Sequence, residues 1–333
     1  MDSDAETYVG CYALSKDESV AIAPWDVGSG GDSLSFLNLA TGRFGLLRPR
    51  AENRFVSGRS LLVEEPVEIT IAFERDDTGA VSSLLWQDGD QPAQRATRTD
   101  IWREEITFTS GELLLAGTLL LPSTEPPYPA IVFVHGSGPG RRESFGALPY
   151  LFAANGFGVL AYDKRGSGGA AGDWRRATFD ELADDVIAAA SMLTQRPEID
   201  SARIGLYGSS QGGWIAPLAA ARCAGVAFVV VVCGSGVTPA EQMLYLHEQR
   251  LRQPGFGDGD ISAARALLAM RNEVARTNEG WPAFDAAVEQ ARAQPWFAYV
   301  DTPPLSPPRQ RWAWRFWNLT NDHDPVPALR QVH

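Results

Sequence analysis

The segment Gly208-Ser209-Ser210-Gln211-Gly212 constrains the fold of this chain more than any other feature. An apolar, strand-like run at residues 204–207 leads into it, and a helix-like run at residues 213–219 follows. A serine at such a turn adopts a strained backbone conformation that lifts its hydroxyl above the sheet, and the two glycines let strand and helix approach. The spacing predicts a strand–turn–helix unit with Ser210 as nucleophile; the alternative is a tight turn without catalysis.

The sequence on both sides of this segment alternates between strand-like and helix-like runs. The strand-like runs are continuously apolar, as expected for a parallel sheet that is covered by helices on both faces. They occupy residues 130–134, 158–162, 203–207 and 226–233, and helices are predicted at 144–155, 179–193 and 211–221. Residues 106–121 precede them as a hairpin. The pattern predicts an α/β domain over residues 99–333.

The first part of the chain has a different pattern. Short apolar and aromatic runs are separated by turn signals, and residues 67–73 alternate with period two, as a half-buried strand does. Strands are predicted at residues 8–14, 20–25, 33–39, 60–63, 67–73 and 81–86. We expect a small antiparallel sandwich or barrel over residues 1–98, with the polar segment 87–98 as the linker.

Residues 237–320 are predicted to be a helical cap inserted after the last of these strands. Thr238-Pro239-Ala240-Glu241 combines an N-cap, a proline at the first helical position and a glutamate that can cap in return. Thr178-Phe179-Asp180-Glu181 is a second capping box, at the start of the predicted helix 179–193. Further helices are expected at residues 261–276, 283–293 and 309–317.

A second motif, His135-Gly136-Ser137-Gly138-Pro139, directly follows the predicted strand 130–134. A glycine-rich turn in this position can direct backbone N–H groups at a developing oxyanion. We expect one donor from Gln211 and the other from Gly136 or Ser137. His135 is a candidate base, but its place at the end of the strand favours a role in bracing the loop.

Together with Tyr162-Asp163-Lys164-Arg165-Gly166-Ser167-Gly168, these motifs resemble the α/β-hydrolase superfamily. The chain looks most like bacterial two-domain carboxylesterases, related to serine aminopeptidase and dipeptidyl-peptidase-like hydrolases. The resemblance implies a β-rich N-terminal domain, a mostly parallel hydrolase sheet and a helical cap. It also implies that Ser210 is the nucleophile, that Gln211 with Ser137 or Gly136 forms the oxyanion hole, and that Asp163 and Arg165 are structural.

The base and the acid of the expected triad are not found in this sequence. A serine hydroxyl needs a base and a group that orients the base, and in this fold both follow the serine. His247 lies in a predicted helix, His323 in a turn, and His333 at the last position. We expect a chain truncated before its last strands, nearly inactive alone and completed by a C-terminal fragment. The exposed sheet edge would also favour a homodimer.

A rearranged site is the alternative, with His323 or His333 paired to Asp322 or Asp324. The expected reaction is carboxylic ester hydrolysis through an acyl-enzyme on Ser210. Peptidase or thioesterase activity, or a non-catalytic binding protein with the same fold, are the other readings. The tryptophans of the cap could form an acyl pocket or simply pack its helices; they are Trp281, Trp296, Trp312, Trp314 and Trp317.

Charge and composition exclude some partners. The net charge of −12 argues against nucleic acid, whose phosphates would be repelled. The start of the chain lacks a signal peptide pattern and no run is long enough to cross a membrane, so a cytoplasmic protein is expected. Cys11, Cys223 and Cys233 are too few for a disulfide framework and are predicted to be core residues. No metal or other cofactor is expected; the predicted small-molecule partner is an ester.

Overall fold

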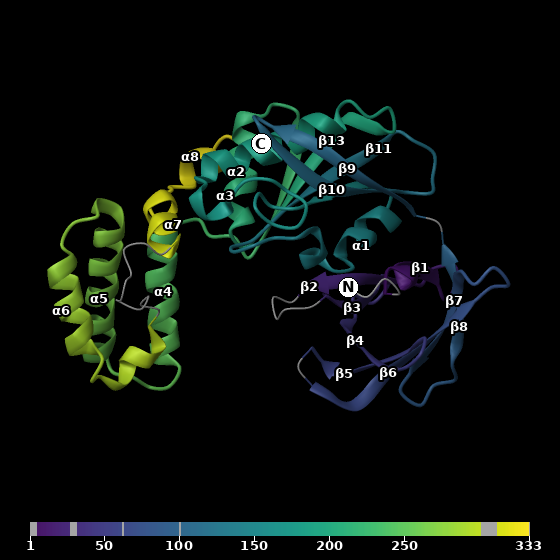
Figure 1. Ribbon diagram of the computed structural model, residues 1–333, viewed down its shortest axis with the longest axis horizontal. Helices are drawn as coiled ribbons and strands as arrows, with labels where there is room; N and C mark the ends of the chain where they lie inside the picture. Colours follow the sequence, from purple (N-terminus) through teal and green to yellow (C-terminus); the bar gives the residue numbers. More distant parts are fainter. Residues whose placement is uncertain (1–4, 27–31, 62, 100, 301–311, 333) are drawn as a thin grey trace.

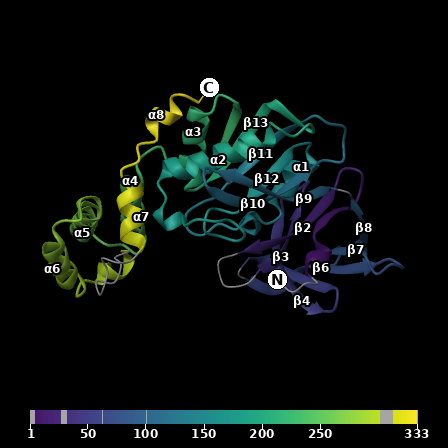
Figure 2. The same cartoon turned by 45° about the horizontal axis from the view of Figure 1, so that its top comes forward.

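The computed structural model describes residues 5–26, 32–61, 63–99, 101–300 and 312–332. Three parts can be followed in Figure 1: a β-barrel, an α/β sheet domain and a bundle of helices that stands apart from both. Helix α1 lies between the second sheet and the barrel in this view. Figure 2 shows the same arrangement after a turn, with α2 and α3 beside the second sheet.

The barrel is closed, with eight antiparallel strands in the order of the chain. A short 3-10 helix, η1 (Ala5–Tyr8), precedes it. The strands are β1 (Gly10–Ala13), β2 (Ser19–Asp26), β3 (Asp32–Asn38), β4 (Phe44–Ala51), β5 (Arg54–Ser60), β6 (Val63–Arg75), β7 (Val81–Asp88) and β8 (Gln94–Thr99). β8 pairs with both β7 and β1, which closes the barrel and leaves no free edge.

The second sheet has six strands in the order β14-β13-β11-β12-β10-β9. Its strands are β9 (Trp102–Ser110), β10 (Leu113–Leu121), β11 (Tyr128–Val134), β12 (Gly158–Tyr162), β13 (Ile199–Ser209) and β14 (Val226–Val232). The β9–β10 hairpin is antiparallel and the four later strands are parallel. This architecture confirms the predicted α/β fold class.

Helices connect the parallel strands and cover the sheet. They are η2 (Arg142–Phe145), α1 (Leu148–Ala154), η3 (Trp174–Arg176), α2 (Phe179–Leu193) and α3 (Gly212–Arg222). α2 and α3 pack on one face of the sheet in one apolar cluster. A second cluster is continuous from the barrel to α1 and to Ile131 and Phe133 of β11, so the barrel packs on the α1 side of the sheet.

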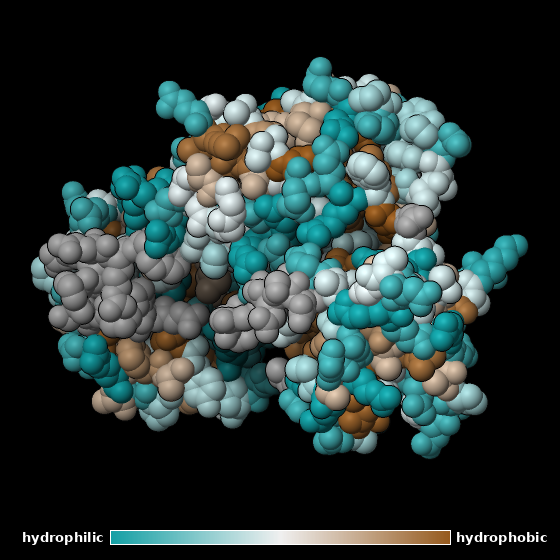
Figure 3. Space-filling view, turned by 45° about the vertical axis from the view of Figure 1, so that its right-hand side comes forward, coloured by the Kyte–Doolittle hydropathy of each residue, from teal (hydrophilic) through white to brown (hydrophobic). Residues whose placement is uncertain are grey.

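The bundle consists of α4 (Pro239–Arg252), α5 (Asp258–Thr277), α6 (Trp281–Ala291), η4 (Pro295–Tyr299) and α7 (Trp312–Thr320), and α8 (Val326–Leu329) returns to α3. Both predicted capping boxes form, at Thr178 with Glu181 and at Thr238 with Glu241. Figure 3 shows hydrophilic side chains over much of the surface, with hydrophobic ones scattered among them. No helix of the described residues is long and apolar enough to cross a membrane.

Some elements differ from the sequence predictions. The predicted linker, residues 87–98, contains strand β8, in which only Ala96 is buried. Strands β4 and β5 were not predicted, and the predicted strand 60–63 falls where β5 ends and β6 begins. The predicted helix 144–155 is split into η2 and α1. Cys233 is exposed rather than in the core, whereas Cys11 is buried.

Candidate active site

Ser210 lies between the end of β13 and the start of α3, in the turn that the sequence predicts. Its φ angle of 53° is in the left-handed region, which a non-glycine residue adopts at a cost of about 1–3 kcal/mol. The Ser210 N–H donates to the carbonyl of Val232, and the Gly213 N–H donates to the carbonyl of Ser210. The residue is exposed, so its hydroxyl is available to a ligand.

The glycines on either side of Ser210 are required by space. A Cβ on Gly208 would lie 2.2 Å from the carbonyl oxygen of Gly212, and a Cβ on Gly212 would lie 2.5 Å from that of Val134. Neither contact can be relieved by rotating a side chain, because both involve backbone atoms. The glycines therefore allow α3 to start directly against β13 and β11.

The loop after β11 lies beside Ser210. A Cβ added to Gly136 would lie 3.5 Å from the Cβ of Ser210, so the backbone of Gly136 passes close to the serine and only a small residue leaves space between them. Within the described part of the chain, the N–H groups of Gly136, Ser137 and Gln211 donate no hydrogen bond. Unpaired amide hydrogens beside an exposed hydroxyl are what an oxyanion hole supplies.

His135 does not face Ser210. It is buried, its ring stacks on Phe145 with centroids 4.4 Å apart, and its Nε2 lies 2.5 Å from the carbonyl oxygen of Tyr162. That contact requires the proton on Nε2. Burial lowers the pKa of His135 to about 4, so the ring is neutral at pH 7. Its geometry is that of a residue that braces the loop.

The other described histidines also lie apart from the serine. His247 is buried in α4, with Nδ1 3.3 Å from the carbonyl oxygen of Tyr299. The ring of His323 packs edge-on against Phe179, and burial lowers its pKa. Among the described residues, no hydrogen bond joins a histidine to Ser210.

The structure does not bring together the alternative pairs of His323 with Asp322 or Asp324. Asp324 accepts from the N–H of Val326, and Asp322 is exposed. The Nε2 of His323 has no hydrogen-bond partner. His333 lies outside the described residues. The described residues therefore do not assemble the alternative triad with His323.

The loop after β12 carries three consecutive charged residues, Asp163, Lys164 and Arg165. Asp163 accepts hydrogen bonds from the backbone and side chain of Arg142, and from the N–H of Gly169. Arg165 forms a bidentate pair with Asp185 of α2, at 2.8 Å for both contacts. Both residues occupy the structural positions that the sequence analysis expects for them.

Lys164, between them, was not singled out from the sequence, although a cation two residues after an apolar strand was the available signal. Its side chain is 2% exposed, and its ammonium donates to the carbonyl oxygens of Gly136 and Gly138 and to Oε1 of Gln211. It also lies 5.4 Å from the ring centroid of Trp174.

Strand β14, on the other side of Ser210, is an edge of the sheet. Among the strands that the structure describes it pairs with β13 alone, and Val230, Val231 and Val232 are each at least 36% exposed. Cys233 follows at φ 55° and is exposed. Unpaired backbone groups and exposed valines make this edge a surface on which another strand can add.

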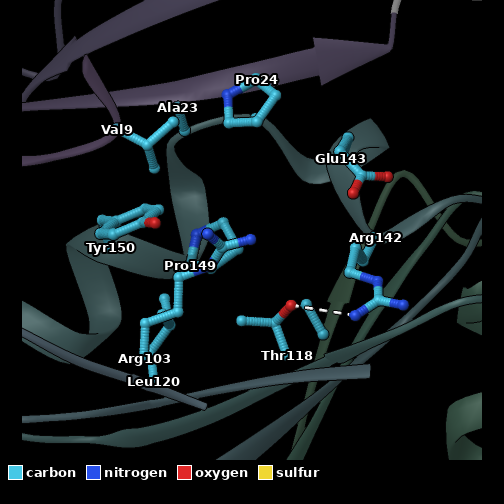
Figure 4. A pocket seen from close by; sticks show the side chains of 12 residues that line it. Val9, Ala23, Pro24, Arg103, Thr118, Leu120, Arg142, Glu143, Pro149 and Tyr150 are labelled. Atoms are coloured by element: carbon cyan, nitrogen blue, oxygen red, sulfur yellow. Dashed lines mark hydrogen bonds between the residues drawn. The ribbon is translucent and has the colours of Figure 1, made fainter. Parts of the chain in front are cut away.

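The described cavities do not include Ser210. One of about 40 Å³, drawn in Figure 4, lies between the barrel and the sheet and is lined in part by Arg103, Arg142 and Glu143. It has room for a few waters and not for an ester. An apolar cavity of about 380 Å³ lies between β2–β4 and α1. No group of three or more described His, Cys, Asp or Glu side chains is arranged to hold a metal.

The tryptophans of the bundle pack its helices. Trp281, Trp296 and Trp314 are buried in the bundle's own apolar cluster. The rings of Trp281 and Trp314 are 4.7 Å apart, and the guanidinium of Arg271 lies 4.4 Å from the ring centroid of Trp317. The side chain of Trp312 is not among those described. The packing role of these residues accounts for their positions.

Comparison with known proteins agrees with this architecture. Esterase EstD of Thermotoga maritima is 25% identical over 210 residues, 57% of this chain and 50% of that protein. Thiohydrolase aneE of Aspergillus aculeatus is 27% identical over 206 residues, 58% of this chain and 64% of that protein. The chain thus spans between half and two thirds of the length of these two relatives.

Solved structures resemble the chain more distantly. Proline iminopeptidase of Mycobacterium smegmatis has a TM-score of 0.43 and 16% identity, over 69% of this chain and 78% of that one. The profile of the alpha/beta hydrolase family matches residues 131–332, more than half of the chain. From β11 through α8, then, sequence and architecture agree, and the chain belongs to the alpha/beta hydrolase family.

Proposed function

We propose that this chain carries the nucleophile and oxyanion hole of a serine hydrolase that cleaves carboxylic esters. The Oγ of Ser210 attacks the ester carbonyl, and the N–H groups of Gln211 and of Gly136 or Ser137 bind the oxyanion. A base takes the hydroxyl proton and passes it to the leaving oxygen, so the C–O bond breaks, the alcohol departs and an acyl-enzyme forms. Water then hydrolyses the acyl-enzyme and releases the acid. The N-terminal barrel has no assigned part in this reaction.

One observation carries the proposal: an exposed serine at φ 53° lies close to a loop whose amide hydrogens are unpaired. The strained conformation is sustained by close backbone contacts at Gly208 and Gly212, which a simple turn does not need. The esterase relative supports the choice of carboxylic esters as substrate class.

The base and the acid are proposed to come from outside the described residues. The exposed edge of β14 lies beside the serine turn, since Ser210 donates to Val232, so a segment that pairs there would reach the hydroxyl. A C-terminal fragment of the same protein is the proposed partner, and a second copy of the chain through the same edge is the alternative.

Covalent labelling tests the nucleophile. A fluorophosphonate probe should form an adduct that mass spectrometry locates on Ser210, slowly because the base is absent. The Ser210→Ala variant should form none, whereas Ser209→Ala, one residue away and outside the proposed machinery, should label at the wild-type rate. Equal labelling of the wild type and Ser210→Ala would contradict the proposal, as would a folded wild type that does not label at all.

A thioesterase is the second candidate, because the aneE relative is named a thiohydrolase. Matched oxygen and thiol esters of the same acyl group distinguish the two. A higher kcat/KM for the thiol ester, measured in the protein completed by its base, would favour the thioesterase. A peptidase, or a binding protein with this fold that does not react at Ser210, are the remaining outcomes.

A further inference from the structure

Lys164 connects the two loops that are proposed to form the oxyanion hole. One loop, after β11, contributes the Gly136 and Gly138 carbonyls, which accept from Nζ at 2.9 and 3.1 Å. The other, at the start of α3, contributes Oε1 of Gln211 at 2.6 Å. An ammonium has three donor hydrogens, so all three are used.

One of the two backbone acceptors, the Gly136 carbonyl, is bonded directly to a proposed oxyanion donor. The carbonyl of Gly136 belongs to the same peptide unit as the N–H of Ser137. When Lys164 holds that carbonyl oxygen, the planar peptide fixes the direction of the N–H on its opposite side. The Gln211 side chain is likewise held, and the backbone N–H of the same residue is the other proposed donor.

The burial of Lys164 indicates that its three hydrogen bonds are needed. Lys164 is 2% exposed, and an ammonium is rarely buried to that extent unless it is paired or hydrogen-bonded. No carboxylate accepts from it; its acceptors are one amide and two backbone carbonyls. Its neighbours Asp163 and Arg165 point elsewhere, to Arg142 and to Asp185.

We propose that Lys164 is a positioning residue for the oxyanion hole, holding the Gly136–Gly138 loop and Gln211 at the spacing that two donors need. The inference rests on the proposed function for its catalytic meaning. The geometry of the amides themselves can be tested without any activity.

The electrostatics agree with the geometry. Burial lowers the pKa of Lys164 to about 7. Hydrogen bonds to carbonyl oxygens favour the charged form of an amine, so acceptors of this kind oppose such a shift. The face of Trp174 adds a further attraction for the cation.

The kinetic test uses fluorophosphonate labelling of Ser210, separated into a maximal rate and a half-saturating probe concentration. Removing one oxyanion donor costs about 10²–10³ in rate, so loosening both loops in Lys164→Met should lower the maximal rate on the order of tenfold to hundredfold. The half-saturating concentration should not change. Lys164→Arg, which keeps the charge and donors, should fall in between.

Arg165→Lys is the matched control. It alters a buried cation in the same loop, but one that points to α2. It should leave the maximal labelling rate within about twofold, whatever it does to the melting temperature. Equal losses in Lys164→Met and Arg165→Lys would show a general effect of loop stability and overturn the inference.

Gln211→Met removes the third acceptor without touching the lysine, and provides a folded variant if Lys164→Met does not fold. If both act through one contact, the double variant should label no more slowly than Lys164→Met alone. Independent, multiplying losses would contradict a shared role.

Hydrogen exchange separates this inference from the proposed function. Exchange at the hydrogen-bonded amides next to the two loops, those of Gly140 and Trp214, should be faster in Lys164→Met than in the wild type, and unchanged in Arg165→Lys. If the wild type does not label at Ser210 but exchange responds in this way, the positioning role stands and the hydrolase proposal fails. Unchanged exchange and unchanged labelling in Lys164→Met would overturn the role of the lysine.

Discussion

The two sides of Ser210 differ in the burial and hydrogen bonding of their residues. On the side of β11 and β12, Lys164, His135 and Asp163 are buried and hydrogen-bonded, and the loop beside the serine is held at several points. On the side of β14 the valines are exposed and the strand has one neighbour. The described residues thus include the proposed oxyanion donors, whereas no hydrogen bond among them joins a base to Ser210.

The largest expected effect concerns the base, which no described residue supplies to Ser210. Typical turnover numbers are near 10 s⁻¹, and loss of triad members costs about 10⁴–10⁶, so this chain alone should turn over an activated ester at roughly 10⁻³ s⁻¹ or less. Adding imidazole should raise the rate of the wild type, because an external base can replace the absent one.

The control is Ser210→Ala under the same imidazole concentrations, which reports the uncatalysed background. A turnover near 10 s⁻¹ for the isolated chain would mean that it already supplies a base to Ser210. A C-terminal fragment that pairs with β14 should raise the rate much further than imidazole does.

The next effect concerns the glycine that allows the turn. Gly208→Ala places a methyl group 2.2 Å from the carbonyl oxygen of Gly212, so we expect the free energy of unfolding to fall by about 3–5 kcal/mol, or no folded protein. Urea denaturation followed by circular dichroism measures it. Gly225→Ala, whose Cβ would have its nearest neighbour at 3.9 Å, should change stability by less than about 1 kcal/mol.

A smaller effect is expected on the side of β11 and β12, where His135 should make the free energy of unfolding depend on pH. The pKa of His135 is about 4 when folded and about 6.5 when unfolded, so the unfolded chain binds the proton first. The lowered pKa of His135 contributes about 3 kcal/mol to the free energy of unfolding. This contribution is fully present above pH 6.5 and is lost as pH falls through 4. Asp163 and Lys164 are the nearest charged groups.

Urea denaturation of the wild type and of His135→Asn at pH 7.5, 5.5 and 4.5 tests this linkage. The wild type should lose more stability than the variant over this range, because asparagine does not titrate. Parallel pH profiles for the two proteins would show that His135 does not bind its proton differently in the folded and unfolded states.

The smallest effect on stability is expected at β14, the edge strand of the second sheet. Val230→Lys adds a charge to β14, where the side chain is 36% exposed, and should change stability by no more than about 0.5 kcal/mol. It should reduce any self-association through that edge. Val63→Lys in the closed barrel, where the valine is 47% exposed, is the control and should not alter association. Sedimentation velocity measures both, and equal behaviour of the two variants would argue against β14 as the contact.

Several features of the fold and the site followed from short stretches of sequence. The turn at Ser210, the capping boxes at Thr178 and Thr238, and the strand–helix alternation were all predicted. Strand β8 was not, because five of its six side chains are exposed and only its pairing with β7 and β1 defines it. A polar strand of this kind has no periodic signal to read.

The sequence by itself determined that a serine stands at a strained turn between a strand and a helix, because that geometry depends on residues within a few positions of one another. Only the tertiary structure decided what surrounds the serine. Lys164 donates hydrogen bonds to Gly136 and Gln211, which are 28 and 47 positions away in the sequence. His135 is hydrogen-bonded to Tyr162, which is 27 positions away. Contacts at such separations arise from the order in which the strands pair, and strand order is a property of the whole sheet.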